Sequence, residues 1–600
     1  MNVRRLVTLA VLAAAAVGAS DRPAAAQEAA PKPDEHGFLP VTIEPPDAHD
    51  CTGKHGGTLT WSTPGEVDTF HPLLANSATS AELKSLVFDS LVAYDNFKWT
   101  DRPWLAWKWE HTDDWLTWTF HLRKGVKWSD GAPFTADDVL FTYETTCNPK
   151  FPNSDVDNFK VGDAALPTLE KLDDFTVRFH LAAVDVMFLN HVATMSIVPA
   201  HVWREAAQGE KPSYATAMGC ADPSKVIGTG PFRIQEYKGG ERIVYERNPL
   251  SWLADKSGAR LPYVDRIIVL LVKDMNTQTL KFRNGDFDLI DDIQVSDFDQ
   301  FREKEKEGAF SLHRLGLHLN TYYIGFNQHP GADKDGKPFV EPYKLAWFQD
   351  VRFRRATSHA IDRDNIVKLF MNGKGSAIYG DTTKANKEWY VETTRYTYDP
   401  AKASALLDEM GLTRRDTDGV RLDASGKRVE FELATNTENQ IRTNIIGQIK
   451  ADLAKVGVSA VTRTAAIGEL INQLSDAHRW EAIVLGWGSS VPPDPLNGQN
   501  VLLSSGRLHV WYPQQTKPAT PWEAESDRLF AQMAQTPDLA KRKEIWKQIA
   551  EIQAQNLGLI YLVAPNCYAA SKKRVMNLRP SVLRPSTWWN FEELWLSDGK

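Results

Sequence analysis

The stretch QIRTNIIGQIKADLAKVGVSAVT, residues 440–462, decides the class of fold. Its apolar residues recur at helical spacing and share one face of an amphipathic helix: Ile441, Ile445, Ile449, Leu453 and Val456. Gly457 is typical of a helix end, and the residues after it are typical of a β-strand. A helix followed at once by a strand is the repeating unit of an α/β protein.

The same alternation extends over most of the chain. Capping residues predict helices that begin after Thr135, Asp350, Asp362 and Asp399. Residues 172–181, LDDFTVRFHL, alternate as one strand, and residues 233–246 predict a hairpin. We therefore predict an α/β architecture of several domains for the 600 residues.

The N-terminal residues are typical of an exported protein. Arg4 and Arg5 precede an apolar stretch and a small-residue cleavage site, which predicts a signal peptide over residues 1–26. Residues 27–56 are rich in Pro, Ala and acidic residues, which predicts a flexible arm. The net charge is −8 and the sequence contains no run of basic residues, so we expect no nucleic-acid partner.

Four cysteines are open to two interpretations. An oxidising compartment favours disulfides, with Cys147 paired to Cys220 and Cys51 paired to Cys567. Buried free thiols are the alternative.

Motifs of catalysis and metal binding are missing from the sequence, which has no GxSxG, HExxH, P-loop or GxGxxG. The acidic pair Asp291-Asp292 is explained most simply as helix caps and solvated surface. His318 and His509 are expected to form hydrogen bonds rather than to bind a metal. We predict no enzyme activity and no cofactor.

Aromatic residues are the conspicuous feature, with 20 tryptophans in the chain. Trp487 lies in LGWGSSVPPDP, residues 485–495, at the end of a predicted strand and between two glycines. A tryptophan without core-forming neighbours suits the wall of a binding site.

Four long segments resemble one protein family. They begin at Trp118 (WTFHLRKGVKWSDGAPFTADDVLFTYE), Val226 (VIGTGPFRIQEYKGGERIVYERNPLSW), Leu261 (LPYVDRIIVLLVKDMNTQTLKFRNGDFDLI) and Phe348 (FQDVRFRRATSHAIDRDNIVKLFMNGKG). In order and spacing they resemble family 5 of the extracytoplasmic solute-binding proteins, the oligopeptide- and dipeptide-binding receptors of ABC transporters.

The resemblance implies a type II periplasmic-binding fold, with two lobes, a hinge near Asn320 and an inserted domain. Domain I would comprise residues 57–94, 226–318 and 566–600, domain II residues 95–225, and domain III residues 319–565. A monomer in the periplasm would capture a small-molecule or peptide ligand and deliver it to an ABC permease in the inner membrane. The alternatives are a receptor for an oligosaccharide or another neutral solute, and a secreted enzyme on the same fold.

The resemblance also implies where the ligand lies. Three segments would line the cleft: the turn at Glu66 and Val67, the strand with His318, Asn320 and Tyr322, and the loop with Trp487 and Gly488. Peptide-binding relatives have an aspartate at the position of Ser490 and an arginine at that of Val484. We therefore expect an extended, weakly charged or neutral solute stacked on Trp487 and Trp511, unless Asp494 replaces the missing acid.

Overall fold

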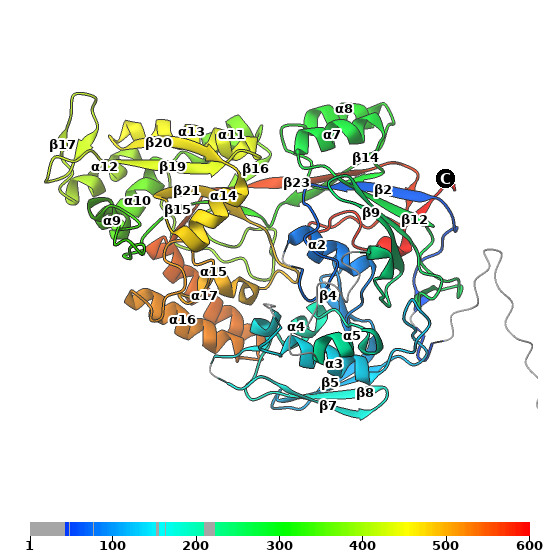
Figure 1. The fold of residues 1–600 in the computed structure, drawn as a ribbon. Helices are drawn as coiled ribbons and strands as arrows, with labels where there is room; N and C mark the ends of the chain where they lie inside the picture. Colours follow the sequence, from blue (N-terminus) through cyan, green and yellow to red (C-terminus); the bar gives the residue numbers. More distant parts are fainter. Residues whose placement is uncertain are drawn as a thin grey trace, which may run out of the picture.

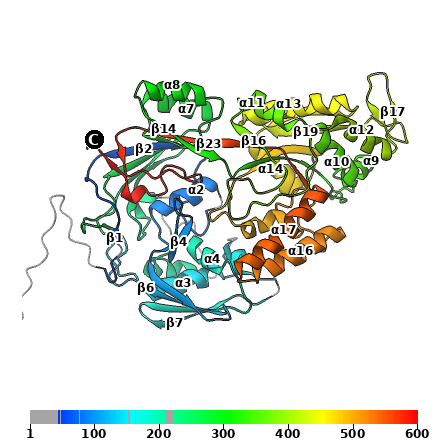
Figure 2. The same cartoon turned by 180° about the vertical axis from the view of Figure 1, so that it is seen from behind.

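The computed structural model describes residues 43–46, 48–75, 77–151, 155–162, 164–208 and 222–599. Figures 1 and 2 show three bodies: one around β2 and β14, one around β15 and β19, and a smaller one around β5 to β8. Within the described ranges, no helix combines the length and apolar character that crossing a membrane requires.

Two sheets build the first body. One has the order β2-β12-β10-β9, formed by Thr58–Thr63, Arg266–Leu271, Arg242–Arg247 and Phe232–Lys238. β2 and β12 are parallel, and the other pairs are antiparallel. The second sheet has the order β13-β23-β14, formed by Leu289–Ile290, Val563–Ser571 and Ser311–Leu317, and β16 (Gly375–Ala377) also pairs with β23.

The second body contains a five-stranded sheet of order β20-β19-β21-β15-β22. Its strands are Ser459–Ala465, Glu430–Asn436, Ala482–Trp487, Thr321–Phe326 and Leu559–Tyr561. Its helices are α9 (Pro342–Gln349), α10 (Val351–Ala360), α11 (Arg363–Phe370), α12 (Pro400–Glu409), α13 (Gln440–Lys455), α14 (Ile467–Asn472), α15 (Gln499–Leu502), α16 (Pro521–Ala534) and α17 (Leu539–Asn556). Every residue of β15 is buried, so this strand runs through the core of the body.

The third body is an antiparallel sheet of order β5-β6-β8-β7 with helices on one side (Figure 1). Its elements are β5 (Ala106–His111), β6 (Thr117–Leu122), β7 (Thr168–Asp173), β8 (Thr176–His180), α3 (Ala136–Thr146), α4 (Phe188–Thr194) and α5 (Ala200–Gln208). The remaining longer helices are α2 (Ala78–Leu83), α7 (Met275–Asn284) and α8 (Phe298–Lys306). Two-stranded pairs are β1 (Ala48–His49) with β11 (Ala254–Asp255), β3 (Val92–Asp95) with β4 (Thr100–Pro103), β17 (Arg414–Arg415) with β18 (Arg421–Leu422), and β24 (Val575–Met576) with β25 (Trp595–Leu596).

The capping predictions are confirmed. Thr135 opens α3 with a capping box that Asp138 completes, and the side chains of Asp350, Asp362 and Asp399 cap α10, α11 and α12. The helix predicted from residue 440 is α13, and its predicted apolar face is buried in the largest hydrophobic cluster.

The single strand predicted over residues 172–181 is wrong. The chain turns there, and β7 and β8 form a hairpin. The reason is local, because the Asp173 carboxylate accepts a hydrogen bond from the Phe175 backbone N–H at 2.7 Å and stabilises the turn.

The predicted flexible arm is also corrected over its described part. Ile43, His49 and Cys51 are buried, and β1 pairs in parallel with β11. Burial of these side chains fixes the end of the arm on the first and third bodies. The predicted signal peptide lies outside the described residues.

The structure does not pair Cys51 with Cys567. Both are buried free thiols, and Cys51 lies 3.7 Å from the Tyr263 hydroxyl. The prediction that pairs Cys147 with Cys220 lies outside the described residues because Cys220 does.

Among the described residues, two of the segments that connect the first and second bodies lie side by side. One joins β14 to β15 through residues 318–320, and the other joins β22 to β23 at Leu562. The segments are bonded to each other, since the His318 N–H donates to the Pro565 carbonyl at 2.9 Å. Away from these segments, the Val186 N–H of the third body donates to the Ala534 carbonyl of the second at 3.0 Å. The second body therefore contacts the first body at the connecting segments and the third body at Ala534.

Candidate functional site

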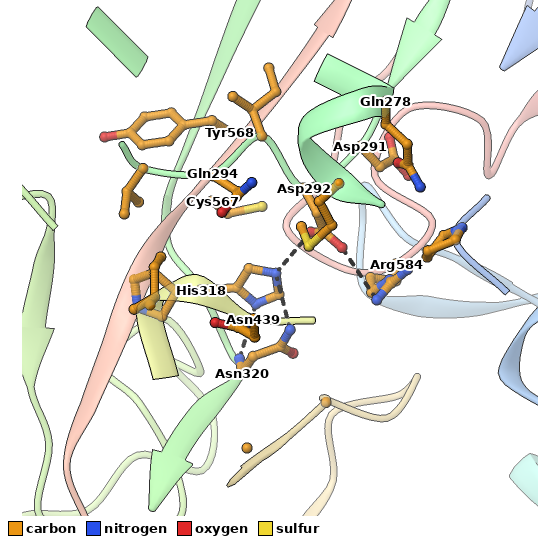
Figure 3. Close-up of a pocket in the computed structure, with 18 of the residues that line it drawn as sticks. Gln278, Asp291, Asp292, Gln294, His318, Asn320, Asn439, Cys567, Tyr568 and Arg584 are labelled. Atoms are coloured by element: carbon orange, nitrogen blue, oxygen red, sulfur yellow. Dashed lines mark hydrogen bonds and ion pairs between the residues drawn. The ribbon is translucent and has the colours of Figure 1, made fainter. Parts of the chain in front are cut away.

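A cavity of about 330 Å³ lies where the two larger bodies face each other, and we call it the cleft cavity. The first body contributes the end of β2, α2, α7 and the loop after β13, while the second contributes the starts of β15 and α13 and the end of β21. Figure 3 shows the side chains that lie around it.

Asp292 lies at the centre of a row of interacting polar and charged side chains in the cleft cavity (Figure 3). Its Oδ2 atom lies 3.2 Å from Arg584 Nη1, and its Oδ1 atom lies 3.4 Å from His318 Nε2. Burial raises the pKa of Asp292, but Arg584 and His318 outweigh it and hold the pKa well below its usual range. Glu82 lies 3.7 Å from Arg584 on the other side. Arg584 is therefore a cation of the protein itself that neutralises both Asp292 and Glu82.

The tautomer of His318 follows from its neighbours. The Asn320 backbone N–H donates to His318 Nδ1 at 3.0 Å, so Nδ1 is an acceptor and Nε2 carries the proton. Nε2 can therefore donate to the Asp292 carboxylate, and Figure 3 marks this contact between the two side chains.

The donor set Asp292, His318 and Cys567 has the spacing of a metal site. The residues do not fit one, because the Nδ1 atom of His318 already accepts a hydrogen bond, its protonated Nε2 atom faces Asp292, and Arg584 forms an ion pair with the same carboxylate. Burial also raises the pKa of the Cys567 thiol. A second set, His49, Glu592 and Glu593, is paired with Arg102 and Arg579, which oppose a further cation.

Asp291 is a lining residue too, so the interpretation of Asp291-Asp292 as caps and solvated surface is wrong. The Ser586 N–H donates to Asp291 Oδ2 at 2.7 Å, and the Thr587 hydroxyl donates to Oδ1. Burial raises the pKa of Asp291 to about 6 despite these bonds.

Arg442 is the cation that the second body brings to the cleft cavity. Its guanidinium lies over the Tyr322 ring at 5.1 Å, and Nη1 donates to Asn436 Oδ1 at 2.9 Å. Within the described ranges no carboxylate forms an ion pair with it. Arg442 is thus a positive group that remains available to a solute.

Trp487 forms a wall of the cleft cavity. Its ring stacks on Tyr323 with centroids 5.2 Å apart, and its buried Nε1–H has no hydrogen-bond partner among the described residues. The flanking glycines differ. A Cβ atom on Gly486 would lie 2.7 Å from the Tyr322 ring, whereas one on Gly488 would meet only Asn320 Oδ1, at 4.0 Å. Gly486 permits close packing, and Gly488 leaves open space beside the tryptophan.

A second cavity of about 290 Å³ lies on the far side of this wall, and we call it the side chamber. Trp487 and Gly488 line both cavities. Ser490 lines the side chamber and is exposed. Asp494 lines it as well, but its Oδ2 atom lies 2.5 Å from Arg542 Nη2 and its Oδ1 atom caps Leu496. The suggestion that Asp494 replaces a missing anchor is therefore not supported, because Arg542 already neutralises it.

The remaining predicted site residues divide into two groups. His318, Asn320 and Tyr322 line the cleft cavity. Glu66 and Val67 lie outside it, since Glu66 forms an ion pair with Lys273 at 2.7 Å and Val67 packs on a hydrophobic cluster.

Trp511 is not a ligand-stacking residue in this structure. It is fully buried, and its Nε1–H donates to Glu523 Oε1 at 3.0 Å. His509 lies against the same carboxylate at 3.2 Å. The cavity residues that sequence reasoning missed come from distant segments: Glu82, Asp291, Asp292, Arg442 and Arg584. The acidic pair in the sequence was the one local signal among them.

A family model described as "Bacterial extracellular solute-binding proteins, family 5 Middle" matches residues 102–508. In sequence, the chain is 28% identical over 543 residues to a probable ABC transporter-binding protein of Deinococcus radiodurans, covering 87% of this chain and 89% of that protein. It is 25% identical over 602 residues to the oligopeptide-binding protein AppA of Bacillus subtilis, covering 100% and 98%.

Solved structures agree with this fold. AppA of Bacillus subtilis in complex with a nonapeptide superposes with a TM-score of 0.74 at 25% identity, over 91% of this chain and 100% of that one. MelB of Agrobacterium fabrum in complex with stachyose superposes with a TM-score of 0.73 at 22% identity, over 92% and 86%.

Proposed function

Because the chain belongs to family 5 of the bacterial extracellular solute-binding proteins, we propose that it is the solute receptor of an ABC importer. It captures a peptide-like or other extended solute between its two lobes and delivers it to a permease. The relatives AppA and the Deinococcus radiodurans protein carry names of this kind, one for oligopeptide binding and one for an ABC transporter.

The observation that carries this proposal is the cleft cavity, whose wall comes from both larger bodies. Two adjacent segments join these bodies, so a change of dihedral angles near Asn320 would open the cavity like a hinge. The division into domains I, II and III with the inserted domain is part of this proposal. Such motion lets a solute enter and then be enclosed on all sides.

The polar groups of the wall suggest what the solute offers. The Trp487 Nε1–H and the Ser489 hydroxyl are buried without a partner among the described residues, where Arg442 contacts Asn436 and Tyr322 but forms no ion pair. A buried donor without a partner costs free energy. A solute with oxygen acceptors along an extended backbone would satisfy these groups.

A neutral oligosaccharide is the second candidate. The half-buried face of Trp487 suits the apolar face of a sugar ring, and MelB has the same fold with stachyose bound. The fold by itself does not restrict the solute to peptides.

The cellular location of the protein and the absence of catalysis are also part of the proposal. We infer export to the periplasm, a monomeric state and no turnover, because the relatives named above are transport binding proteins. Incubation with the captured solute should return it unchanged by mass spectrometry. A product in that experiment would favour the secreted enzyme.

Native mass spectrometry of the purified protein tests the receptor function. We expect a retained solute, and calorimetry with that solute should show about fivefold weaker binding for Trp487→Ala, since stacking on an indole contributes about 1 kcal/mol. Trp107→Ala is the matched control, because Trp107 is 40% exposed and outside both cavities. Unchanged affinity of Trp487→Ala would remove the loop from the site.

A further inference from the structure

The third body contacts the second body at a place far from the connecting segments. A turn at residues 185–187 precedes α4, and within it the Val186 N–H donates to the Ala534 carbonyl, at the end of α16, at 3.0 Å. On α4 itself, Asn190 Nδ2 donates to Asn497 Oδ1 at 3.1 Å. Figures 1 and 2 both show α4 beside α16 and α17 and well away from β23.

An apolar side chain of the third body completes this contact. Met187 is buried in a hydrophobic cluster whose other buried members come from the second body, among them Leu529, Met533 and Ile545. Val186 packs against the same cluster, and these two are its only members from the third body among the described residues. Separating the bodies would return the Met187 side chain to water, so the contact favours the form in which the bodies touch.

The turn that presents Met187 is held in shape by the third body itself. The Met187 N–H donates to Asp185 Oδ1 at 2.9 Å, and His191 Nε2 lies 3.4 Å from Asp185 Oδ2. Both interactions are made within residues 185–191. The turn therefore does not need the second body in order to keep its conformation.

The third body is fixed to the first body and moves with it. One hydrophobic cluster contains Trp252 and Tyr263 of the first body together with Trp104 and Phe120 of the third. The Asp89 carboxylate joins the two parts, because it accepts from Trp252 Nε1–H at 2.9 Å and from Trp104 Nε1–H at 2.7 Å. A rotation at the hinge would therefore move both bodies together and break the contact between α4 and α16.

The same contact is linked to the wall that carries Trp487. Asn497, which accepts from Asn190, also donates through Nδ2 to the Pro492 carbonyl at 2.8 Å. Pro492 belongs to the loop that follows Trp487, and Asn497 lines the side chamber. In contrast, no described residue of 95–225 lines the cleft cavity or the side chamber.

We propose that Val186, Met187 and Asn190 form a latch, which holds the two lobes closed on the side away from the hinge and slows the release of solute. The inserted domain thus acts on binding without touching the solute, by favouring the closed form. This inference goes beyond the proposed function and rests only on its hinge. The latch acts before a solute is present, so part of the empty protein is closed.

Small-angle X-ray scattering of the full chain, stripped of retained solute, tests the latch without any ligand. For the wild type we expect a profile that the closed structure fits for most of the molecules. Met187→Ser should raise the ratio of open to closed protein at least tenfold, with a larger radius of gyration, because the apolar contact is lost. Asn190→Ala removes one hydrogen bond and should raise the ratio about fivefold.

Leu172→Ser is the matched control. Leu172 is an apolar residue of the same body, but it is 42% exposed and lies outside the cluster that Met187 enters. This variant should scatter as the wild type does. Circular dichroism should show the same fold for all four proteins, and Asn190→Ala tests the latch even if Met187→Ser is poorly folded.

The outcomes separate the latch from the receptor function. A wild type that is open throughout, or latch variants that scatter as the wild type does, would overturn the latch. Neither result concerns solute capture, because the scattering is measured without solute. Conversely, a protein that captures no solute but opens in Met187→Ser would keep the latch and lose the receptor function.

Discussion

Trp487 and Trp511 lie in the same hydrophobic cluster but in different chemical surroundings. The Trp511 indole is fully buried, stacks near Trp522 at 5.9 Å and donates its N–H to Glu523. The Trp487 indole separates two cavities, and its N–H has no partner among the described residues.

The difference gives a criterion for tryptophans in a receptor. A tryptophan whose N–H is satisfied by the protein is part of the core, because its polar atom already has its bond. A tryptophan at a cavity wall with an unsatisfied N–H can donate a hydrogen bond to a solute. Mutations of the two residues should therefore affect different quantities, the first stability and the second affinity.

Trp511→Ala should have the largest effect. Loss of a fully buried tryptophan leaves a cavity and removes one of the hydrogen bonds to Glu523, so we expect the free energy of unfolding to fall by about 3–5 kcal/mol. Urea unfolding measures it, with Trp487→Ala as the control that loses less. The comparison fails if Trp511→Ala is nearly as stable as the wild type but binds solute more weakly.

The second largest effect is expected in the dependence of stability on pH, and it comes from Glu523. Burial would raise its pKa, but hydrogen bonds from His509, Gln515, Thr520 and Trp511 outweigh it and lower the pKa to about 2. Because the folded value is below the unfolded value, the ionised form stabilises the protein above about pH 4.5, and this contribution is lost as the pH falls toward 2.

Glu523→Gln should remove that contribution, which amounts to about 3 kcal/mol at neutral pH. Urea unfolding at pH 6 and at pH 3 should show a steep loss for the wild type and a shallower one for the variant. Parallel pH profiles of the two proteins would show that the Trp511 region does not depend on this carboxylate.

The two glycines beside Trp487 sharpen the comparison within one loop. Gly486→Ala places a Cβ atom 2.7 Å from the Tyr322 ring, so we expect a loss of about 1–3 kcal/mol of unfolding free energy. Gly488→Ala has room and should change stability by less than about 0.5 kcal/mol. Equal thermal stability of the two variants would contradict the close packing assigned to Gly486.

Local signals in the sequence predicted much of the fold. The helix caps at Thr135, Asp350, Asp362 and Asp399 depend on residues within three positions, so the sequence shows them directly. The resemblance supplied Trp487, His318, Asn320 and Tyr322 as cavity residues.

The parts that could not be predicted depend on contacts between distant segments. Asp292 and Arg584 are 292 positions apart in sequence numbering and meet because β13 and the C-terminal segment belong to one body. The sequence around Trp511 likewise does not show that Glu523 lies within hydrogen-bond distance of its indole. Charge neutralisation is a property of the folded chain, and so the pairing of Asp494 with Arg542 could not be predicted from the sequence.

Calorimetric titration of the retained solute into Gly488→Leu tests the central claim most directly, that solute is bound along the wall formed by Trp487 and Gly488. The added side chain would occupy the open space between the two cavities without disturbing the packing at Gly486. We predict at least a hundredfold loss of affinity at unchanged unfolding free energy. Wild-type affinity in this variant would contradict the account, because the solute would then have to lie elsewhere.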